Sequence, residues 1–252
     1  MPAKFPAVDI QEPLMISQIN ESKQQEIIEL TEQKGKELPE REKEVRLKWR
    51  SKCGLESDLF NKTFTNFKRN NQPNAYDIVK NLKRSLLLYS ENIYGLGKTH
   101  LVAALVNDLI NTSPAAEIEL WNGLDPVIFD LPCPAYYVRE VNLMDRIRAT
   151  FNRREVDGVT IGETEQDVYS VLKHVNLLII DDVGKIRPRD LSFLQSIYFR
   201  LIDDRYVNHK NIIFTTNMTL LELGNHIGGA SADRLREMCD FVKMTGKSYR
   251  HK

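Results

Sequence analysis

A phosphate-binding pattern lies near the middle of the chain, at residues 92–100 (NIYGLGKTH). Gly95 and Gly97 let the backbone turn sharply, so that successive backbone N–H groups can face phosphate oxygens. Lys98 would place its ammonium against the β- and γ-phosphates, and the Thr99 hydroxyl would bind Mg²⁺. A helix that begins at this point adds the positive end of its dipole. The pattern therefore predicts a P-loop that binds a nucleotide together with Mg²⁺.

One position departs from the usual pattern G-x-x-x-x-G-K-[ST], because Asn92 stands where the first glycine is expected. Asparagine adopts a positive φ more readily than most residues, so a closed loop is still expected. A chance Gly-Lys-Thr turn is the alternative, and the predicted strand before the motif and helix after it disfavour that alternative. The predicted nucleotide-binding residues are Asn92, Gly95, Leu96, Gly97, Lys98, Thr99 and His100.

Two adjacent acids, Asp181 and Asp182, end an apolar run further along the chain. Ligands of α/β proteins bind at the carboxyl ends of the strands, so we expect both carboxylates at the phosphate site. Asp181 would hold Mg²⁺ together with Thr99, and Asp182 would orient or deprotonate the attacking water. Asn217 ends the following strand and would contact the γ-phosphate or that water; the alternative is a helix cap. A water-activating acid favours ATP hydrolysis, and no Asn-Lys-x-Asp guanine reader follows the P-loop.

Alternating apolar runs and helical stripes would position these motifs. Strands are expected at 84–89, 136–139, 176–180, 211–216 and 241–244. Helices are expected at 75–82, 99–110, 143–151 (capped by Asn142), 191–202, 219–226 and 231–238. Strands that alternate with helices predict an α/β fold with a parallel sheet flanked by helices. Residues 112–134, rich in proline, are expected to form a long connection.

The N-terminal part of the chain has a different composition. Residues 1–13 hold three prolines and predict a loose tail, whereas residues 15–51 are rich in helix-forming Glu, Gln, Lys and Arg. Apolar positions there are too sparse for a coiled coil, so we expect one or two helices that need a partner surface. The prediction is a helical partner-binding region at 1–55 and an ATPase domain at 56–252.

Composition excludes several classes of protein. Lys plus Arg and Asp plus Glu both number 35 among 252 residues, so no global basic field attracts nucleic acid. Three scattered cysteines argue against a disulfide scaffold and against a four-cysteine zinc site. No apolar run is long enough to span a membrane, and no secretion signal is evident. The sequence therefore predicts a cytoplasmic protein without a membrane partner.

Several short stretches of the sequence, taken together and in their order along the chain, are more specific than any single motif. They are NKTFTNF (61–67), GLGKTHL (95–101), NLMDRIRATF (142–151), LLIIDDVGK (177–185), LIDDRY with IIFTTN (201–217), GGASADRLREM (228–238) and MTGKSYR (244–250). Through them the chain resembles the DnaC/DnaI-type helicase-loader branch of the AAA+ ATPases, which also includes IstB transposition proteins. The resemblance implies a P-loop AAA+ core without a C-terminal lid domain, preceded by a small helical region.

The resemblance also implies residue roles. Lys98 and Thr99 match Walker A, Asp181 and Asp182 match Walker B, and Asn217 matches sensor 1. Arg234 matches the arginine finger that completes a neighbouring subunit's ATP site, with Arg236 as its rival. A finger supplied by a neighbour implies a homo-oligomer.

The implied function is that of a nucleotide-dependent oligomer that grips single-stranded DNA and acts on a replicative helicase of DnaB type. The DNA-binding candidates are Arg146, Phe151, Arg153 and Arg154, because arginines beside an aromatic ring suit a backbone groove with a stacking platform. Arg146 and Arg153 would share a face if their helix continued. Lys185, Arg187 and Arg189 follow the two acids and would line the same pore.

Two alternative functions remain open from the sequence. One is an IstB-like transposition regulator that bends duplex DNA, since the core motifs are common to both groups. The other is an adaptor that uses ATP as a conformational switch without hydrolysing it, because Asp182 stands where many AAA+ proteins have glutamate. Residues 1–75 are expected to separate the first alternative from a loader, through capture of a helicase.

Overall fold

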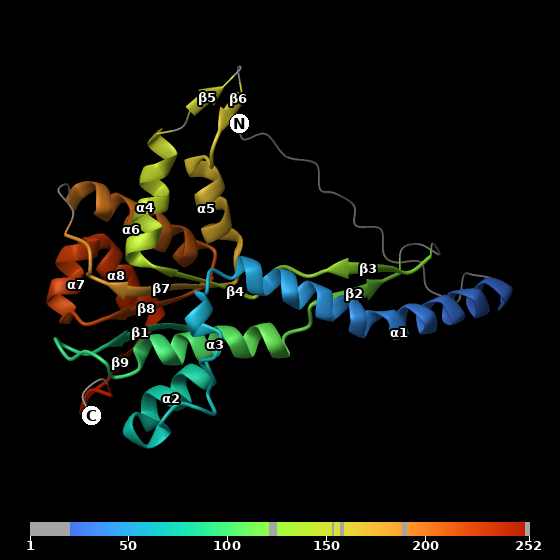
Figure 1. Cartoon of the computed structure of the whole chain (residues 1–252), viewed down its shortest axis with the longest axis horizontal. Helices are drawn as coiled ribbons and strands as arrows, with labels where there is room; N and C mark the ends of the chain where they lie inside the picture. The colour runs from blue at the N-terminus through green and yellow to red at the C-terminus, as the bar shows by residue number, and fades with distance from the viewer. Residues whose placement is uncertain (1–20, 121–124, 153, 157–158, 188–190, 250–252) are drawn as a thin grey trace, which may run out of the picture. The chain divides into compact units, whose positions relative to one another are not determined.

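The computed structural model describes residues 21–120, 125–152, 154–156, 159–187 and 191–249 (Figure 1). The chain divides into two compact units. One comprises the chain up to Leu47 with Pro114–Leu131, and the other comprises Lys48–Ser113 with Pro132–Lys252. The division predicted at residues 55 and 56 stays a prediction, as does the partner-binding role of the first region. The predicted tail at 1–13 lies outside the described residues.

The first unit contains most of helix α1 (Glu21–Lys52) and an antiparallel hairpin of β2 (Ala116–Glu119) and β3 (Val127–Asp130). The hairpin replaces part of the long connection predicted at 112–134. Its two strands pair Ile118 with Ile128, and polar partners on α1 hold it. The Arg41 guanidinium donates from Nε to Asp130 Oδ1 at 2.7 Å. Helix α1 is a single helix with a proline inside it, which agrees with the helical composition of residues 15–51.

The second unit is built on a parallel sheet of five strands in the order β4-β7-β8-β1-β9. The strands are β4 (Ala135–Arg139), β7 (Leu177–Val183), β8 (Asn211–Thr216), β1 (Ser85–Tyr89) and β9 (Cys239–Lys243). Leu87 of β1 lies opposite Phe214 on one side and Phe241 on the other. This architecture confirms the predicted α/β fold, because the five predicted strands form one parallel sheet whose central strands β7, β8 and β1 are almost entirely buried.

Helices cover both faces of this sheet (Figure 1). One face packs against α4 (Glu140–Ala149), α5 (Glu165–His174), α6 (Leu191–Val207), α7 (Leu220–Ile227) and α8 (Gly229–Met238). Helices α2 (Pro73–Lys80) and α3 (Lys98–Thr112) lie on the opposite side. Short 3₁₀ turns at Ser57–Leu59, Arg69–Asn71 and Thr150–Asn152, and a small hairpin of β5 (Arg154–Val156) and β6 (Val159–Ile161), complete the unit.

Two helix predictions need correction. Helix α4 begins at Glu140 after an extended Arg139, so Asn142 lies inside the first turn and is not the predicted cap. Helix α5 was not expected, although Thr164 and Asp167 form a capping box at its start. Its apolar residues are few, which weakens the periodic signal in the sequence. Among the described helices, none combines the length and the hydrophobicity that crossing a membrane requires.

Candidate nucleotide-binding site

The loop between β1 and α3 has the backbone conformation of a phosphate cradle. Asn92, Gly95 and Gly97 adopt φ angles of 62°, 74° and 90°, all in the left-handed region. Asn92 therefore supplies the conformation that a glycine supplies in the usual pattern, as the sequence predicts. Its N–H donates to the backbone carbonyl of Asn217 at 2.7 Å, which ties the loop to the end of β8.

Aromatic side chains pack against this loop. A Cβ atom at Gly97 would lie 2.7 Å from Cε2 of Phe67, so a side chain at this position would displace that ring. The Phe67 ring centroid lies 5.2 Å from that of His100 and 6.3 Å from that of Tyr249. The N–H of Tyr249 also donates to the carbonyl of Gly95 at 2.9 Å. The loop is thereby held from the outside by segments distant in sequence.

Lys98 lies at the start of α3 and is buried, with 6% of its surface exposed. Its ammonium donates to Asn217 Oδ1 at 2.7 Å and to the hydroxyl of Ser90. Ser90 Oγ is itself 3.2 Å from Asn217 Oδ1. The structure therefore brings together the predicted phosphate-binding lysine, at the start of α3, and the predicted sensor, directly after β8.

Asp181 is fully buried at the end of β7. Its carboxylate accepts hydrogen bonds from the hydroxyls of Thr99 at 2.9 Å, Tyr137 at 2.8 Å and Thr215. Burial raises the pKa of Asp181, and the nearby charge of Asp182 raises it further, whereas the three hydroxyls oppose this rise. Asp181 thus lies behind Thr99, with its carboxylate directed at the hydroxyl that is the other predicted Mg²⁺ ligand.

Asp182 owes its direction to a β-bulge. Ile180 pairs with Phe214 but Val183 pairs with Thr216, so β7 contains one extra residue at this point. Asp182 takes the left-handed conformation, with φ 58°, and its N–H donates to Thr215 Oγ1 at 3.0 Å. Asp181 is fully buried, whereas Asp182, which lies in the bulge, is half-buried and lines the cleft described below.

A cleft of about 730 Å³ joins these groups. It is lined by most of the predicted residues, namely Gly95, Leu96, Gly97, Lys98, Thr99, His100, Asp182 and Asn217. Asn92 and Asp181 lie outside the lining and contact residues that form it. Glycines at a helix start, a buried ammonium and carboxylates at the sheet edge fit a nucleotide carrying a hydrated divalent cation.

The remaining lining residues were given no role in the sequence-based prediction of the nucleotide site. They are Asp58, Leu59, Lys62, Asn66, Phe67, Lys68, Tyr94, Arg139, Lys185, Ser248 and Tyr249. His100 is fixed among them, because its Nε2 lies 2.8 Å from Asn66 Oδ1 and 3.0 Å from the carbonyl of Thr63. Burial lowers the pKa of His100. Three stretches of the resemblance contain some of these residues, namely NKTFTNF, LLIIDDVGK and MTGKSYR, but none of the stretches by itself indicates a place in the cleft.

The two DNA-binding candidates whose side chains the structure describes, Arg146 and Phe151, do not line this cleft. Arg146 is paired with Glu163 at 2.7 Å and donates to the Tyr136 hydroxyl at 2.7 Å. Phe151 is 58% exposed and packs near Phe193, with ring centroids 5.9 Å apart. Helix α4 ends at Ala149, so the continued helix on which a face shared by Arg146 and Arg153 depended is absent from the described residues. Arg153 and the side chain of Arg154 lie outside the described residues.

Arg234 lies on α8 and is absent from the lining of the cleft of its own chain, as a finger supplied to a neighbour requires. Its guanidinium pairs with Asp203 at 2.7 Å and lies over the ring of Phe199, 4.8 Å from the centroid. Arg236 instead pairs with Asp233 within the same helix at 2.7 Å and is largely exposed.

Comparison with known proteins gives one family match. Residues 135–252 match the family of IstB-like ATP binding proteins. A curated relative, the chromosomal replication initiator protein DnaA of Streptococcus mutans serotype c (strain ATCC 700610 / UA159), is 22% identical over 125 residues. That alignment covers 50% of this chain and 22% of the relative, so the chain spans about a fifth of the relative's length.

Solved structures share the fold at low sequence identity. The DnaC helicase loader has a TM-score of 0.55 at 19% identity, over 75% of this chain and 100% of that chain. DnaI has a TM-score of 0.56 at 15% identity, over 76% and 95%. The replication initiator DnaA bound to AMPPCP and single-stranded DNA has a TM-score of 0.54 at 18% identity, over 74% and 50%. The chain therefore has the AAA+ P-loop fold of these structures, and its residues 135–252 are similar to the IstB-like ATP binding proteins.

Proposed function

We propose that this chain is a Mg²⁺-dependent ATPase that loads or remodels a replicative DNA helicase of DnaB type on single-stranded DNA. The observation that carries the proposal is the cleft that joins Lys98, Asp182 and Asn217 at one edge of the sheet. These three groups supply the cation, the carboxylate and the amide that ATP hydrolysis requires.

Each residue of the cleft would have a separate role in binding or hydrolysing ATP. Lys98 and the N–H groups of the loop hold the β- and γ-phosphates, and Thr99 with Asp181 holds the metal ion. A metal ion held there would supply positive charge against the charge that develops on the phosphates. Asp182 orients the attacking water, and Asn217 positions that water or the γ-phosphate.

The nucleic-acid and helicase parts of the proposal are supported by the similar structures. One of these is described as a helicase loader, and another contains single-stranded DNA together with AMPPCP. On this chain, the proposed DNA-binding residues are Arg146, Phe151, Arg153 and Arg154. Phe151 is exposed enough to stack on a base.

ATP hydrolysis by the purified chain, with and without single-stranded DNA, tests this proposal. We expect turnover that rises several-fold with DNA and disappears in Lys98→Ala, because oligomers of this kind couple the two ligands. If turnover is the same with and without DNA, and Lys98→Ala shows no turnover, hydrolysis is not coupled to DNA binding. A pull-down with a DnaB-type helicase, using the full chain, then tests the partner.

Two observations each favour a different alternative function. The IstB-like family match favours a transposition regulator, which would form filaments on duplex DNA and would not capture a helicase. The short carboxylate of Asp182, in a strained left-handed conformation, favours an ATP switch with little hydrolysis. Tight ATP binding with negligible turnover, both with and without DNA, would support the switch over the ATPase.

Arg234→Ala should separate binding from hydrolysis. We expect the dissociation constant for ATP to stay within about twofold, because Arg234 does not line the cleft of its own chain. Hydrolysis stimulated by assembly should fall by on the order of 10³, the usual contribution of an arginine finger. The measurement is turnover as a function of protein concentration.

The matched control for this prediction is Arg236→Ala, two residues along the same helix. Its ion pair with Asp233 is exposed, so its loss should have little effect on stability. If Arg234→Ala keeps full turnover in the assembled state and Arg236→Ala loses it, the finger is Arg236.

A further inference from the structure

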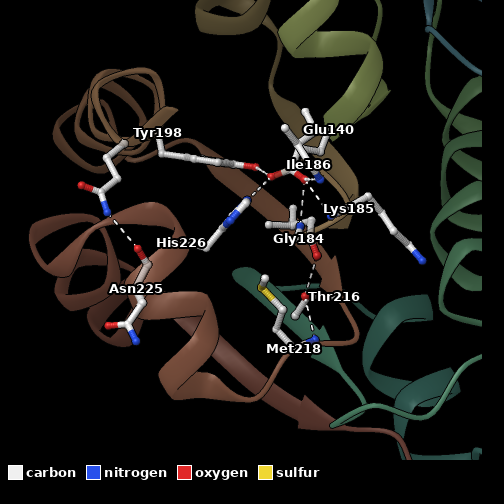
Figure 2. A network of polar contacts seen from close by, with 11 residues as sticks. Glu140, Gly184, Lys185, Ile186, Tyr198, Thr216, Met218, Asn225 and His226 are labelled. Atoms are coloured by element: carbon white, nitrogen blue, oxygen red, sulfur yellow. Dashed lines mark hydrogen bonds and ion pairs between the residues drawn. The ribbon is translucent and has the colours of Figure 1, made fainter. Parts of the chain in front are cut away.

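The loop that follows β7 is held by a single buried carboxylate oxygen. The backbone N–H groups of Gly184, Lys185 and Ile186 all donate to Glu140 Oε2, at 2.8, 3.0 and 3.2 Å (Figure 2). Glu140 is the first residue of α4 and is fully buried. Three consecutive donors on one oxygen fix the path of this loop, and with it the direction in which the Lys185 side chain leaves the backbone.

The other oxygen of the same carboxylate is anchored to two helices. Glu140 Oε1 accepts from the Tyr198 hydroxyl of α6 at 2.6 Å and from His226 Nε2 of α7 at 2.5 Å (Figure 2). Burial alone would raise the pKa of Glu140, but the hydrogen bonds from His226 and Tyr198 outweigh burial and lower it. The carboxylate is therefore ionised at neutral pH, which strengthens its hold on the three N–H groups.

The opposite side of the loop is also fixed. The carbonyl of Val183 accepts from the Thr216 hydroxyl at 2.7 Å, and that hydroxyl in turn accepts from the N–H of Met218 at 3.1 Å (Figure 2). The segment directly after the two acids is thus clamped between the start of α4 and the end of β8. Such preorganisation is typical of backbone that supports a binding site.

The loop presents Lys185 to the nucleotide cleft. Lys185 is part of the cleft lining, and its ammonium lies 4.8 Å from the ring centroid of Tyr94, the residue before Gly95. Within the described part of the chain, no carboxylate lies within ion-pair distance of this ammonium. Tyr94 is 51% exposed, so this contact between the ammonium and the ring is a weak one. The ammonium can therefore exchange the ring for a phosphate oxygen at little cost.

We propose that Lys185 is a second phosphate-binding lysine of the cleft, and that Glu140 is the residue that positions it. The inference rests on the proposed function, since it takes the cleft to bind ATP. It assigns Lys185 to the nucleotide of its own chain and not to the DNA-binding pore. Arg187 provides the contrast, because it is an exposed cation on the same loop that does not line the cleft.

The first test compares Lys185→Ala with Arg187→Ala in the full chain, by calorimetric titration with Mg²⁺-ATP. Both variants remove one positive charge from the same loop. We expect Lys185→Ala to raise the dissociation constant about tenfold or more, and Arg187→Ala to change it by less than about twofold. Equal effects would contradict the inference. So would a Lys185→Ala variant that loses affinity for single-stranded DNA but keeps its affinity for ATP.

The second test asks whether Glu140 acts through Lys185. Glu140→Leu removes both acceptors, so the amides of residues 184–186 should exchange hydrogen faster in the nucleotide-free protein, whereas Lys185→Ala should leave their exchange unchanged. ATP affinity of the double variant should be within about twofold of that of Lys185→Ala, because the two residues act on one contact. Losses that multiply would show that Glu140 does not act through Lys185.

A milder substitution of Glu140 keeps the second test possible if Glu140→Leu does not fold. Glu140→Gln keeps one oxygen for the three N–H groups, so its loss of ATP affinity should be smaller than that of Glu140→Leu. If Glu140→Leu does not fold, Glu140→Gln combined with Lys185→Ala completes the same comparison. A wild-type chain that does not bind ATP would overturn the proposed function. If the wild-type chain binds ATP and Lys185→Ala binds it with the same affinity, this inference fails and the proposed function stands.

Discussion

Lys98→Ala is expected to abolish tight binding of ATP. The Lys98 ammonium is buried, and it lies between Ser90 and Asn217 at the edge of the sheet where the loop and the carboxylates meet. A charge-assisted hydrogen bond contributes about 1.5–3 kcal/mol, and Lys98 would make such bonds to two phosphates. The dissociation constant should therefore rise by on the order of 10²–10⁴. Calorimetric titration with Mg²⁺-ATP measures this change directly.

A matched control excludes a general effect of removing a positive charge. Lys80 is an exposed residue at the end of α2, and its ammonium lies 5.8 Å from the ring centroid of Tyr76. Lys80→Ala should keep its ATP affinity within about twofold of wild type. Circular dichroism of both variants shows whether the fold is intact. Unchanged ATP affinity in a folded Lys98→Ala chain would exclude this loop as the phosphate site.

Arg205→Leu is expected to destabilise the fold strongly. Arg205 is fully buried, and its guanidinium donates to the carbonyls of Leu172, Val175, Asn176 and Asn211. Burial lowers the pKa of Arg205 to about 10, so the side chain is still protonated at neutral pH. Leucine would leave four carbonyls without this donor, near the end of α5 and the starts of β7 and β8. We expect a loss of about 3–5 kcal/mol in the free energy of unfolding.

Urea denaturation measures this loss, and the midpoint of thermal unfolding should fall by roughly 10 °C for a domain of this size. Arg200→Ala is the control on the same helix. Its guanidinium pairs with Glu165 at 2.6 Å on the surface and lies over the Tyr169 ring, so its removal should cost about 1 kcal/mol. Similar losses in both variants would contradict the role assigned to buried Arg205.

The sheet was predictable from the sequence because each of its buried strands is a continuous apolar run. The run at 177–180 illustrates this, since all four residues are buried. Helix α5 was missed because few of its residues are apolar, although the capping box at its start is a signal that the sequence carries. The β2–β3 hairpin was missed because polar contacts with α1, such as Arg41 with Asp130, support it.

The candidate site was predictable where one short motif carries the chemistry, as at Lys98 and Asp182. Residues that reach the cleft from distant segments carry no such pattern. Phe67 and Tyr249 meet at the loop only because the chain folds them there. Glu140 has no local signal either, because its role depends on backbone groups more than forty residues away.

The backbone link from Tyr249 to the Gly95 carbonyl has a mechanical consequence. A force applied to the segment after β9 would pass through this hydrogen bond to the turn at Gly95, which is part of the proposed phosphate-binding loop. The same segment is anchored further back, where Gln72 Nε2 donates to the Thr245 carbonyl at 2.6 Å. A partner that binds this segment, or a tag attached to it, would therefore shift the loop that contains Gly95. We expect such a shift to change the rate of nucleotide release.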